Sequence, residues 1–185
     1  MARLLELCRP NERVARITEI DLARLRSEGF EALMLDLDNT LCPWQSHEVP
    51  EDVRAWLERA KSLGMKVCIV SNTHNPRRLR QIAEELGVPS LDRALKPRRR
   101  AFARAAEMVG SCPGRTVVVG DQILTDVIGG NRAGMRTILV EPMHPREFIG
   151  TKLSRLVERL ISALSRRANA GTKPEPMQSE TQDTK

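Results

Sequence analysis

The spacing of two aspartates, Asp36 and Asp38, is the first indication of chemistry in this chain. They follow an apolar run at residues 32–35, which predicts a short buried strand with the acids at its exposed end. In an open parallel sheet that end is where ligands bind. If Asp36 is still extended, both carboxylates point into one site, where a divalent cation such as Mg²⁺ would relieve their repulsion. Taken alone, the same residues also fit a polar turn that ends a strand.

Further polar residues follow the later predicted strands. They are Ser71 with Asn72, Lys96 with Pro97, and Asp121 with Asp126. A carboxylate nucleophile, a hydroxyl, an ammonium group and another acid are the groups that phosphoryl transfer through a phosphoaspartate needs. We therefore predict that Asp36 attacks the phosphorus, and that Asp38 protonates the leaving oxygen and then activates water.

The remaining polar residues have predicted roles around this nucleophile. The predicted phosphate contacts are Asn39, Thr40, Ser71, Asn72 and Lys96. The predicted Mg²⁺ ligands are Asp36, Asp121 and the main-chain carbonyl of Asp38. Asp126 is predicted to complete or steady that metal shell.

Predicted strands and helices alternate along the chain. The strands are expected at residues 32–35, 66–70, 91–95, 116–119 and 137–140. The helices are expected at residues 51–62, 76–86, 98–109 and 125–133. This alternation is typical of an α/β fold, and it predicts a Rossmann-like, five-stranded parallel sheet with right-handed crossovers and helices on both faces.

The segments between the motifs are short. Only residues 41–50 separate the first motif from the next helix, and residues 72–95 already hold a predicted helix and a predicted strand. Neither segment can hold a cap domain, so we predict an open site from which no domain of this chain excludes water. An open site suits a phosphate carried on something large, such as a lipid headgroup at a bilayer, a polynucleotide end or a protein.

The sequence divides into four predicted parts. They are an N-terminal helical arm at residues 1–28, a catalytic core at residues 29–150, an amphipathic basic helix at residues 151–167 and a disordered tail at residues 168–185. Leucine, isoleucine and valine recur at helical intervals along the predicted last helix, with lysine and arginine between them. This apolar face fits either packing on the sheet or contact with an anionic membrane, and the sequence leaves both open.

Composition limits the partners that the chain can have. The formal net charge is +6 and the isoelectric point is about 9.6, so a basic surface suits an anionic partner. Aromatic residues make up only 3% and tyrosine is absent, which argues against nucleic-acid binding by base stacking. No secretory signal is visible, and no apolar run approaches the ~20 residues of a membrane span. The four cysteines form no CxxC pair, so we expect a cytoplasmic protein with reduced thiols.

As a set, the motifs resemble those of the haloacid dehalogenase superfamily of phosphatases. The set is DxDxT at residues 36–40, Ser-Asn at residues 71–72, lysine at residue 96 and GDxxxxD at residues 120–126. Longer matches at residues 36–41, 69–72, 120–134 and 137–140 resemble the YqeG branch, which is similar to capless phosphatidylglycerophosphate phosphatases. This resemblance implies an Mg²⁺-dependent phosphomonoesterase, most of all a phosphatidylglycerophosphate phosphatase of phospholipid biosynthesis.

Two alternatives remain open. A capless nucleotide or polynucleotide phosphatase would use the same site, and a non-catalytic binding protein would use the same scaffold. Asp38 argues against the second alternative because it supplies an acid and base for hydrolysis. The arginines at residues 77–80 and 98–100 would bind phosphates in any of these proteins, or form a solvated face.

The expected partner is a phosphomonoester, with a lipid headgroup phosphate preferred. Peripheral contact with an anionic membrane, at its inner surface, is part of the same prediction. Near the site, Cys42 and Trp44 are assigned to local packing, and His74 is assigned to the surface.

Overall fold

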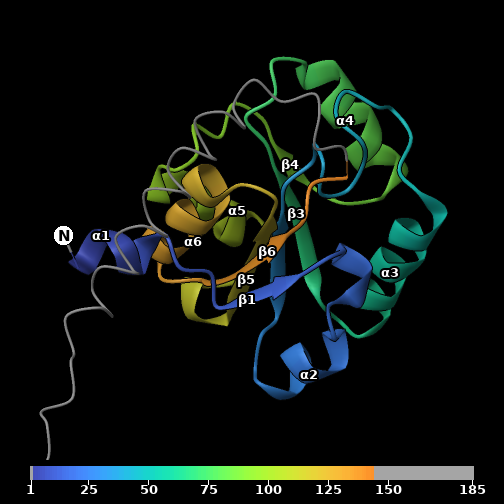
Figure 1. The fold of residues 1–185 in the computed structure, drawn as a ribbon. Coiled ribbons are helices and arrows are strands. Elements are labelled where there is room, and N and C mark those ends of the chain that lie inside the picture. Colours follow the sequence, from blue (N-terminus) through green and yellow to red (C-terminus); the bar gives the residue numbers. More distant parts are fainter. Residues whose placement is uncertain (1, 144–185) are drawn as a thin grey trace, which may run out of the picture. The chain divides into compact units, whose positions relative to one another are not determined.

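The computed structural model describes residues 2–143, and the structural statements below concern those residues. The predicted helix at residues 151–167 and the predicted tail at residues 168–185 lie outside them. In chain order the first elements are α1 (Ala2–Leu7), β1 (Glu12–Val14), the short helical turn η1 (Ile17–Glu19), α2 (Leu22–Ser27), β2 (Ala32–Leu35), α3 (Glu51–Ser62) and β3 (Lys66–Val70) (Figure 1). They are followed by α4 (Pro76–Glu85), β4 (Ser90–Leu91), α5 (Arg99–Met108), the turn η2 (Pro113–Arg115), β5 (Thr116–Gly120), the π-helical turn η3 (Ile123–Val127), α6 (Ile128–Ala133) and β6 (Arg136–Val140).

All the strands belong to one parallel sheet in the order β1-β6-β5-β2-β3-β4. The prediction of a parallel α/β sheet is confirmed, but the sheet has six strands where five were predicted. The additional strand is β1, which pairs with residues 138–140 of β6, in a part of the chain that was predicted to be a helical arm. A strand of three residues is too short for its alternation to be recognised in the sequence.

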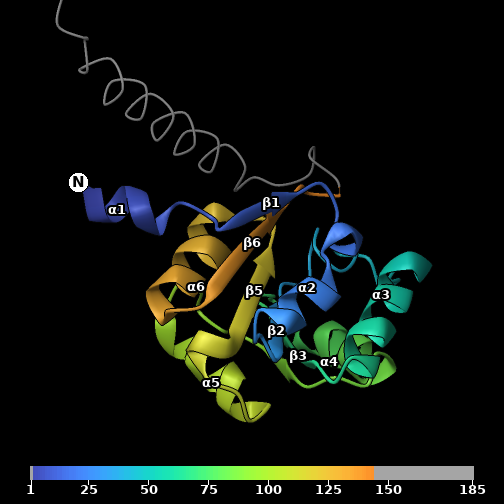
Figure 2. The same ribbon diagram turned by 90° about the horizontal axis from the view of Figure 1, so that it is seen from below.

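Helices cover both faces of the sheet, which explains why the central strands are apolar at almost every position. Leu33 and Leu35 of β2 pack into the cluster formed with α2, α3 and α4. The alternate residues Ala32 and Met34 pack into a second cluster, which contains Phe102 and other side chains of α5. Figures 1 and 2 show α2, α3 and α4 on one side of the strands and α5 and α6 on the other.

The register brings the polar ends of the central strands to one level. Leu35, the last residue of β2, pairs with Ile69 of β3 and with Val119 of β5. After β2 the chain builds β3 and β4 on one side, and it then crosses back to build β5 and β6 on the other. The carboxyl end of β2 is therefore the point where the strand order reverses, and such a point forms a crevice for ligands.

The connections at this edge are short. Within residues 2–143, neither the segment between β2 and α3 nor the segment between β3 and α5 contains a cap domain. The described part of the chain also has no helix long and apolar enough to cross a membrane.

Candidate active site

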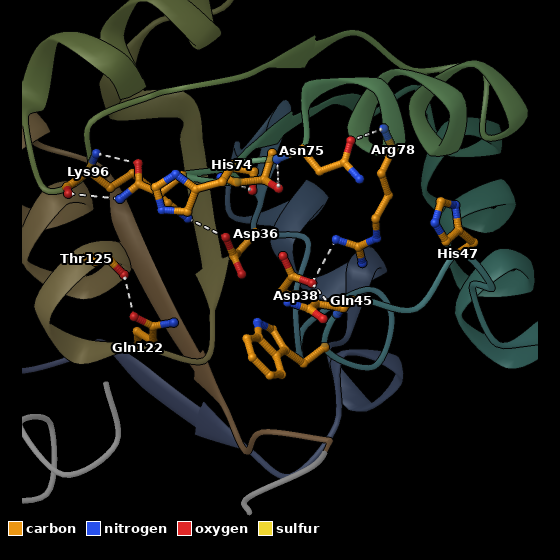
Figure 3. Close-up of a pocket in the computed structure, with 14 residues that line it drawn as sticks. Asp36, Asp38, Gln45, His47, His74, Asn75, Arg78, Lys96, Gln122 and Thr125 are labelled. Atoms are coloured by element: carbon orange, nitrogen blue, oxygen red, sulfur yellow. Dashed lines mark hydrogen bonds and ion pairs between the residues drawn. The ribbon is translucent and has the colours of Figure 1, made fainter. Parts of the chain in front are cut away.

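A cavity of about 710 Å³ lies at the carboxyl ends of the strands. Its lining residues come from the ends of β2 and β3, from α4, and from the loops before α3, α5 and α6. They are Asp36, Asp38, Trp44, Gln45, His47, Ser71, Asn72, Thr73, His74, Asn75, Arg78, Lys96, Gln122 and Thr125. Figure 3 shows Asp36 and Asp38 near the centre of this group, with Lys96 on one side and Arg78 on the other.

Asp36 is paired with the one lysine of the cavity lining. Lys96 Nζ donates to Asp36 Oδ1, and it also donates to Asp126 Oδ1 at 2.7 Å. All three side chains are buried. Burial alone would lower the pKa of Lys96, but Asp126 and Asp36 raise it above its ordinary value, so the ammonium keeps its charge.

Asp36, Asp121 and Asp126 form an acidic cluster beside this lysine. One carboxylate oxygen from each lies within 4.8 Å of the other two, as the ligands of one metal ion would. Asp121 Oδ1 is buried and has no hydrogen-bond partner within the described residues. Burial, followed by the neighbouring carboxylates, raises the pKa of Asp121 to about 8, and burial raises that of Asp36 to about 7. A divalent cation would offset the repulsion among these carboxylates and favour their ionised forms. The residues of the cluster therefore fit a metal ion.

Gly120 allows this cluster to form. A Cβ atom at residue 120 would lie 2.3 Å from Asp126 Cγ and 2.4 Å from Asp126 Oδ2, which is far closer than side-chain atoms approach. The backbone N–H of Gln122 donates to the same carboxylate oxygen at 3.3 Å, and Thr125 Oγ1 donates to it at 3.2 Å. Only glycine fits at residue 120 without a clash, because the Asp126 side chain lies against the backbone there.

Asp38 has different partners. Its Oδ1 accepts from Arg78 Nη1 at 2.9 Å and from the backbone N–H of Gln45 at 2.9 Å. Arg78 is only 4% exposed although it is an arginine, and it belongs to the buried face of α4. Its Nε donates to the carbonyl oxygen of Ser46 at 2.7 Å, and its Nη2 lies 3.1 Å from Cys42 Sγ.

The second and third motifs are joined by hydrogen bonds between the side chain of Asn72 and the backbone of Lys96. Asn72 Nδ2 donates to the carbonyl oxygen of Lys96 at 3.1 Å, and the N–H of Lys96 donates to Asn72 Oδ1 at 2.9 Å. Ser71 Oγ accepts from the backbone N–H of Thr73 at 3.1 Å. Asn72 thus fixes the backbone from which Lys96 reaches the two aspartates.

Two of the predicted phosphate contacts lie elsewhere. Asn39 and Thr40 are buried and line a neighbouring cavity of about 400 Å³, with residues 15–17 and 140–143. They do not line the larger cavity. Thr40 Oγ1 is buried without a hydrogen-bond partner in the described part of the chain. Their contact with phosphate remains a prediction, as does a metal ligand from the carbonyl of Asp38.

Several cavity residues were not predicted from the sequence. Arg78 is the most notable, because the arginines of α4 were considered only as a phosphate-binding rim or a solvated face. One sequence signal was available, since Arg78 stands four residues before the apolar Ile82 and next to Leu79 on the same helix. Trp44, which was assigned to packing, and the exposed His74 also line the cavity.

Cys42, which contacts Arg78, stays a neutral thiol. Burial raises the pKa of the Cys42 thiol to about 12, so it stays protonated.

Comparison with known sequences agrees with this architecture. The family model described as haloacid dehalogenase-like hydrolase matches residues 33–93, and a second model, of HAD-hydrolase-like proteins, matches residues 93–142. The chain is 40% identical over 161 residues to the "Probable phosphatase YqeG" of Bacillus subtilis, covering 86% of this chain and 93% of that protein.

A plant relative extends the comparison. The chain is 30% identical over 179 residues to "Phosphatidylglycerophosphate phosphatase 1, chloroplastic/mitochondrial" of Arabidopsis thaliana, covering 89% of this chain and 49% of that protein. The chain therefore spans about half of the plant relative's length.

Solved structures share the fold at low sequence identity. The cobalt-bound form of the deoxy-D-mannose-octulosonate 8-phosphate phosphatase YrbI from Haemophilus influenzae has a TM-score of 0.51 at 15% identity, covering 79% of this chain and 95% of that chain. An uncharacterised protein from Listeria monocytogenes has a TM-score of 0.52 at 20% identity, covering 64% of this chain and 85% of that chain.

The parallel sheet and these relatives define the chain as a hydrolase of the haloacid dehalogenase superfamily, with the α/β fold described above. Within that superfamily it belongs to the YqeG family, and it is a phosphatase, a phosphoric monoester hydrolase.

Proposed function

We propose that this phosphatase depends on Mg²⁺, works through a phosphoaspartate on Asp36, and hydrolyses phosphatidylglycerophosphate. The observation that carries the proposal is the position of Asp36. It lines an open cavity at the strand ends, is paired with Lys96, and is within metal-sharing distance of Asp121 and Asp126.

The proposed reaction has two steps. A carboxylate oxygen of Asp36 forms a bond to phosphorus while the bond from phosphorus to the leaving oxygen breaks, and Asp38 gives its proton to that oxygen. Asp38 then takes a proton from water, whose oxygen attacks the phosphorus, releases inorganic phosphate and restores the Asp36 carboxylate. Lys96, which contacts the Asp36 carboxylate, and Ser71 would bind the phosphoryl oxygens and offset their charge.

The acidic cluster is the proposed metal site. Asp36, Asp121 and Asp126 would hold Mg²⁺, with the main-chain carbonyl of Asp38 as a further ligand. Bound Mg²⁺ would supply positive charge next to the phosphoryl oxygens in the transition state. The buried and unpartnered Asp121 Oδ1 supports this assignment, because a buried carboxylate oxygen without a donor is costly.

The substrate proposal rests on the relatives and on the surface beside the site. The Arabidopsis relative carries phosphatidylglycerophosphate phosphatase in its name, as does one from Chlamydomonas reinhardtii. Leu95, directly before the site lysine, is 58% exposed, and the arginines at residues 98–100 are exposed just after it. An apolar side chain among cations suits the surface of an anionic bilayer. We place the enzyme in the cytoplasm, in peripheral contact with the inner membrane surface.

The predicted division of the chain is part of this proposal. A core at residues 29–150 would carry the chemistry, and the basic helix predicted at residues 151–167 would add a second contact with the membrane.

A substrate comparison tests the proposal. Release of inorganic phosphate is measured with Mg²⁺ from phosphatidylglycerophosphate in lipid vesicles, from 3′- and 5′-phosphorylated DNA, and from nucleotides, with Asp36→Asn as the blank. The highest kcat/KM is expected on the lipid, and EDTA is expected to abolish turnover until Mg²⁺ is restored. A higher kcat/KM on phosphorylated DNA would favour the polynucleotide phosphatase instead, and full turnover in EDTA would contradict the metal assignment.

A further inference from the structure

We propose that Arg78 is a positioning residue, which holds the carboxylate of Asp38 and the loop at residues 42–46 in place against α4. No motif of the chain contains Arg78, and Asp38 is the group through which it would act. The inference rests on the proposed function of Asp38 as the acid that protonates the leaving oxygen.

The contacts of Arg78 are unusually complete for an arginine. Its Nη1 reaches Asp38 Oδ1 at 2.9 Å, its Nε donates to the carbonyl oxygen of Ser46 at 2.7 Å, and its Nη2 reaches Cys42 Sγ at 3.1 Å. Each nitrogen of the planar guanidinium therefore has its own acceptor. Lysine offers a single nitrogen on a flexible stem and could not make all three contacts at once.

Burial makes these contacts obligatory. Arg78 is 4% exposed, and an isolated cation at that depth would be strongly destabilising. The neighbouring arginines of α4, Arg77 and Arg80, are exposed. The helix itself begins just before Arg78, because the Asn75 side chain accepts from the Arg78 N–H at 3.1 Å and Pro76 occupies the first turn. The position of the guanidinium is thus set by a capped helix end.

The contacts leave one oxygen of Asp38 for the substrate. Within residues 2–143, Arg78 Nη1 and the Gln45 N–H both approach Oδ1, which leaves Oδ2 to exchange a proton. Figure 3 shows Arg78 extending from α4 toward Asp38 and Gln45. A carboxylate fixed by two donors on one oxygen presents the other in a constant direction, which is the requirement for efficient proton transfer.

Arg78 also anchors a wall of the site. The loop that connects β2 to α3 contributes Trp44, Gln45 and His47 to the cavity lining. Arg78 contacts this loop at Cys42 and at Ser46, on both sides of Trp44. Because the described residues form no cap over the site, this wall, held by one buried side chain, is what shapes this side of the cavity.

The test compares two leaving groups. p-Nitrophenolate leaves without a proton, whereas the alkoxide of glycerol 3-phosphate needs one from Asp38. We expect Arg78→Gln to lower kcat/KM for glycerol 3-phosphate by up to about 10²-fold, the loss expected from a misplaced catalytic group. The loss for p-nitrophenyl phosphate should be several times smaller, and the loss for glycerol 3-phosphate should lie in kcat more than in KM. Arg59→Gln, which removes an exposed arginine of α3, should change neither value.

A double-variant comparison separates this inference from the proposed function. If Arg78 acts through Asp38, adding Arg78→Gln to Asp38→Asn should lower kcat/KM for glycerol 3-phosphate by less than it does in the wild-type chain. An equal loss in both backgrounds, or an equal loss on both leaving groups by a folded Arg78→Gln protein, overturns the inference. If Asp38→Asn lowers kcat/KM equally for both substrates, the proposed role of Asp38 as the acid for the leaving group fails whatever Arg78 does.

Arg78→Lys covers the case in which the glutamine variant does not fold. The lysine keeps a cation near Asp38 but lacks the three nitrogens of the planar guanidinium. Its kcat/KM should show the same preference for p-nitrophenyl phosphate, with a smaller loss for glycerol 3-phosphate. A folded Arg78→Lys protein with wild-type kcat/KM on both substrates would overturn the need for a guanidinium.

Discussion

Asp36 and Asp38 belong to one motif, but the structure gives them opposite surroundings. Asp36 is buried beside the half-buried Asp121 and the buried Asp126, and it shares the ammonium group of Lys96 with Asp126. Asp38 is partly exposed, and a buried arginine and a backbone N–H compensate it. The Asp36 side of the cavity therefore has more negative charge than cations to balance it, and the Asp38 side does not.

This difference shows how neighbouring carboxylates come to differ in function. A carboxylate group with too few cations favours binding of a metal ion, because the ion removes a repulsion that burial strengthens. A carboxylate that is already balanced gains little from an ion but can present one oxygen to a substrate. Lys96 and Arg78 separate the two roles, and both lie far along the chain from the motif that contains Asp36 and Asp38.

The largest expected effect tests the Asp36 side. Asp36→Asn keeps the size of the side chain but removes the nucleophile, so kcat/KM should fall by about 10³-fold or more, as it does when other enzymes lose their nucleophile. Phosphate release under Mg²⁺ measures the loss, and circular dichroism verifies the fold. Turnover within a few-fold of the wild-type value would show that the carboxylate is not the attacking group.

The metal ligands should give the next largest effect. Asp121→Asn removes one charge from the acidic cluster, so the Mg²⁺ concentration for half-maximal activity should rise by about 10- to 100-fold, the range seen when groups around a metal are altered. Asp52→Asn is the matched control, since Asp52 is an exposed aspartate at the start of α3 and is not part of the cluster. An unchanged Mg²⁺ requirement in Asp121→Asn would move the metal site away from these three residues.

Most of the Asp36 side could be predicted from the sequence, because its residues stand at fixed places after apolar strands. The strand ends that carry Asp36, Ser71 and Asp121 were correctly placed, and the register then puts them at one edge. Local pattern and strand order together were sufficient here.

The Asp38 side could not be predicted in the same way. Arg78 lies on a helix, and only the tertiary fold shows that its face of α4 meets the loop at residues 42–46. A lone arginine in an arginine-rich helix resembles its solvated neighbours. The strand β1 was missed for a similar reason, since its three residues pair with β6, which lies more than 120 residues further along the chain.

The steric basis of the acidic cluster gives a smaller expected effect. Gly120→Ala would place a methyl group 2.3 Å from Asp126 Cγ, so the Asp126 side chain must move and its contact with Lys96 is disturbed. Stability should fall by about 1–3 kcal/mol, the usual cost of an added methyl group in a packed interior, and activity should fall with it. Gly114→Ala is the control, because a Cβ there meets nothing within 4 Å and both changes remove a glycine. Denaturant unfolding and phosphate release of the two variants would measure the difference, and equal behaviour would contradict the close approach.

The pH dependence of stability should show the smallest effect, and it concerns the metal-free protein. Burial raises the pKa of Asp36 to about 7 and that of Asp121 to about 8, above the value of about 4 expected for an unfolded aspartate. Between about pH 4 and pH 8 the folded chain therefore binds more protons than the unfolded chain. The contribution of protonated Asp36 and Asp121 to the free energy of unfolding is fully present below about pH 4 and is lost as the pH rises to about 8.

The Tm of the protein in EDTA should therefore fall as the pH is raised from 5.5 to 8.5. Saturating Mg²⁺ should reduce that fall, because it favours the ionised carboxylates in the folded state. Asp121→Asn should also reduce the fall in EDTA, since it removes one of the two groups, whereas Asp52→Asn should not. A Tm in EDTA that rises over this range would mean that the Asp36 side of the cavity is better compensated than its contacts indicate, and the contrast with Asp38 would then be lost.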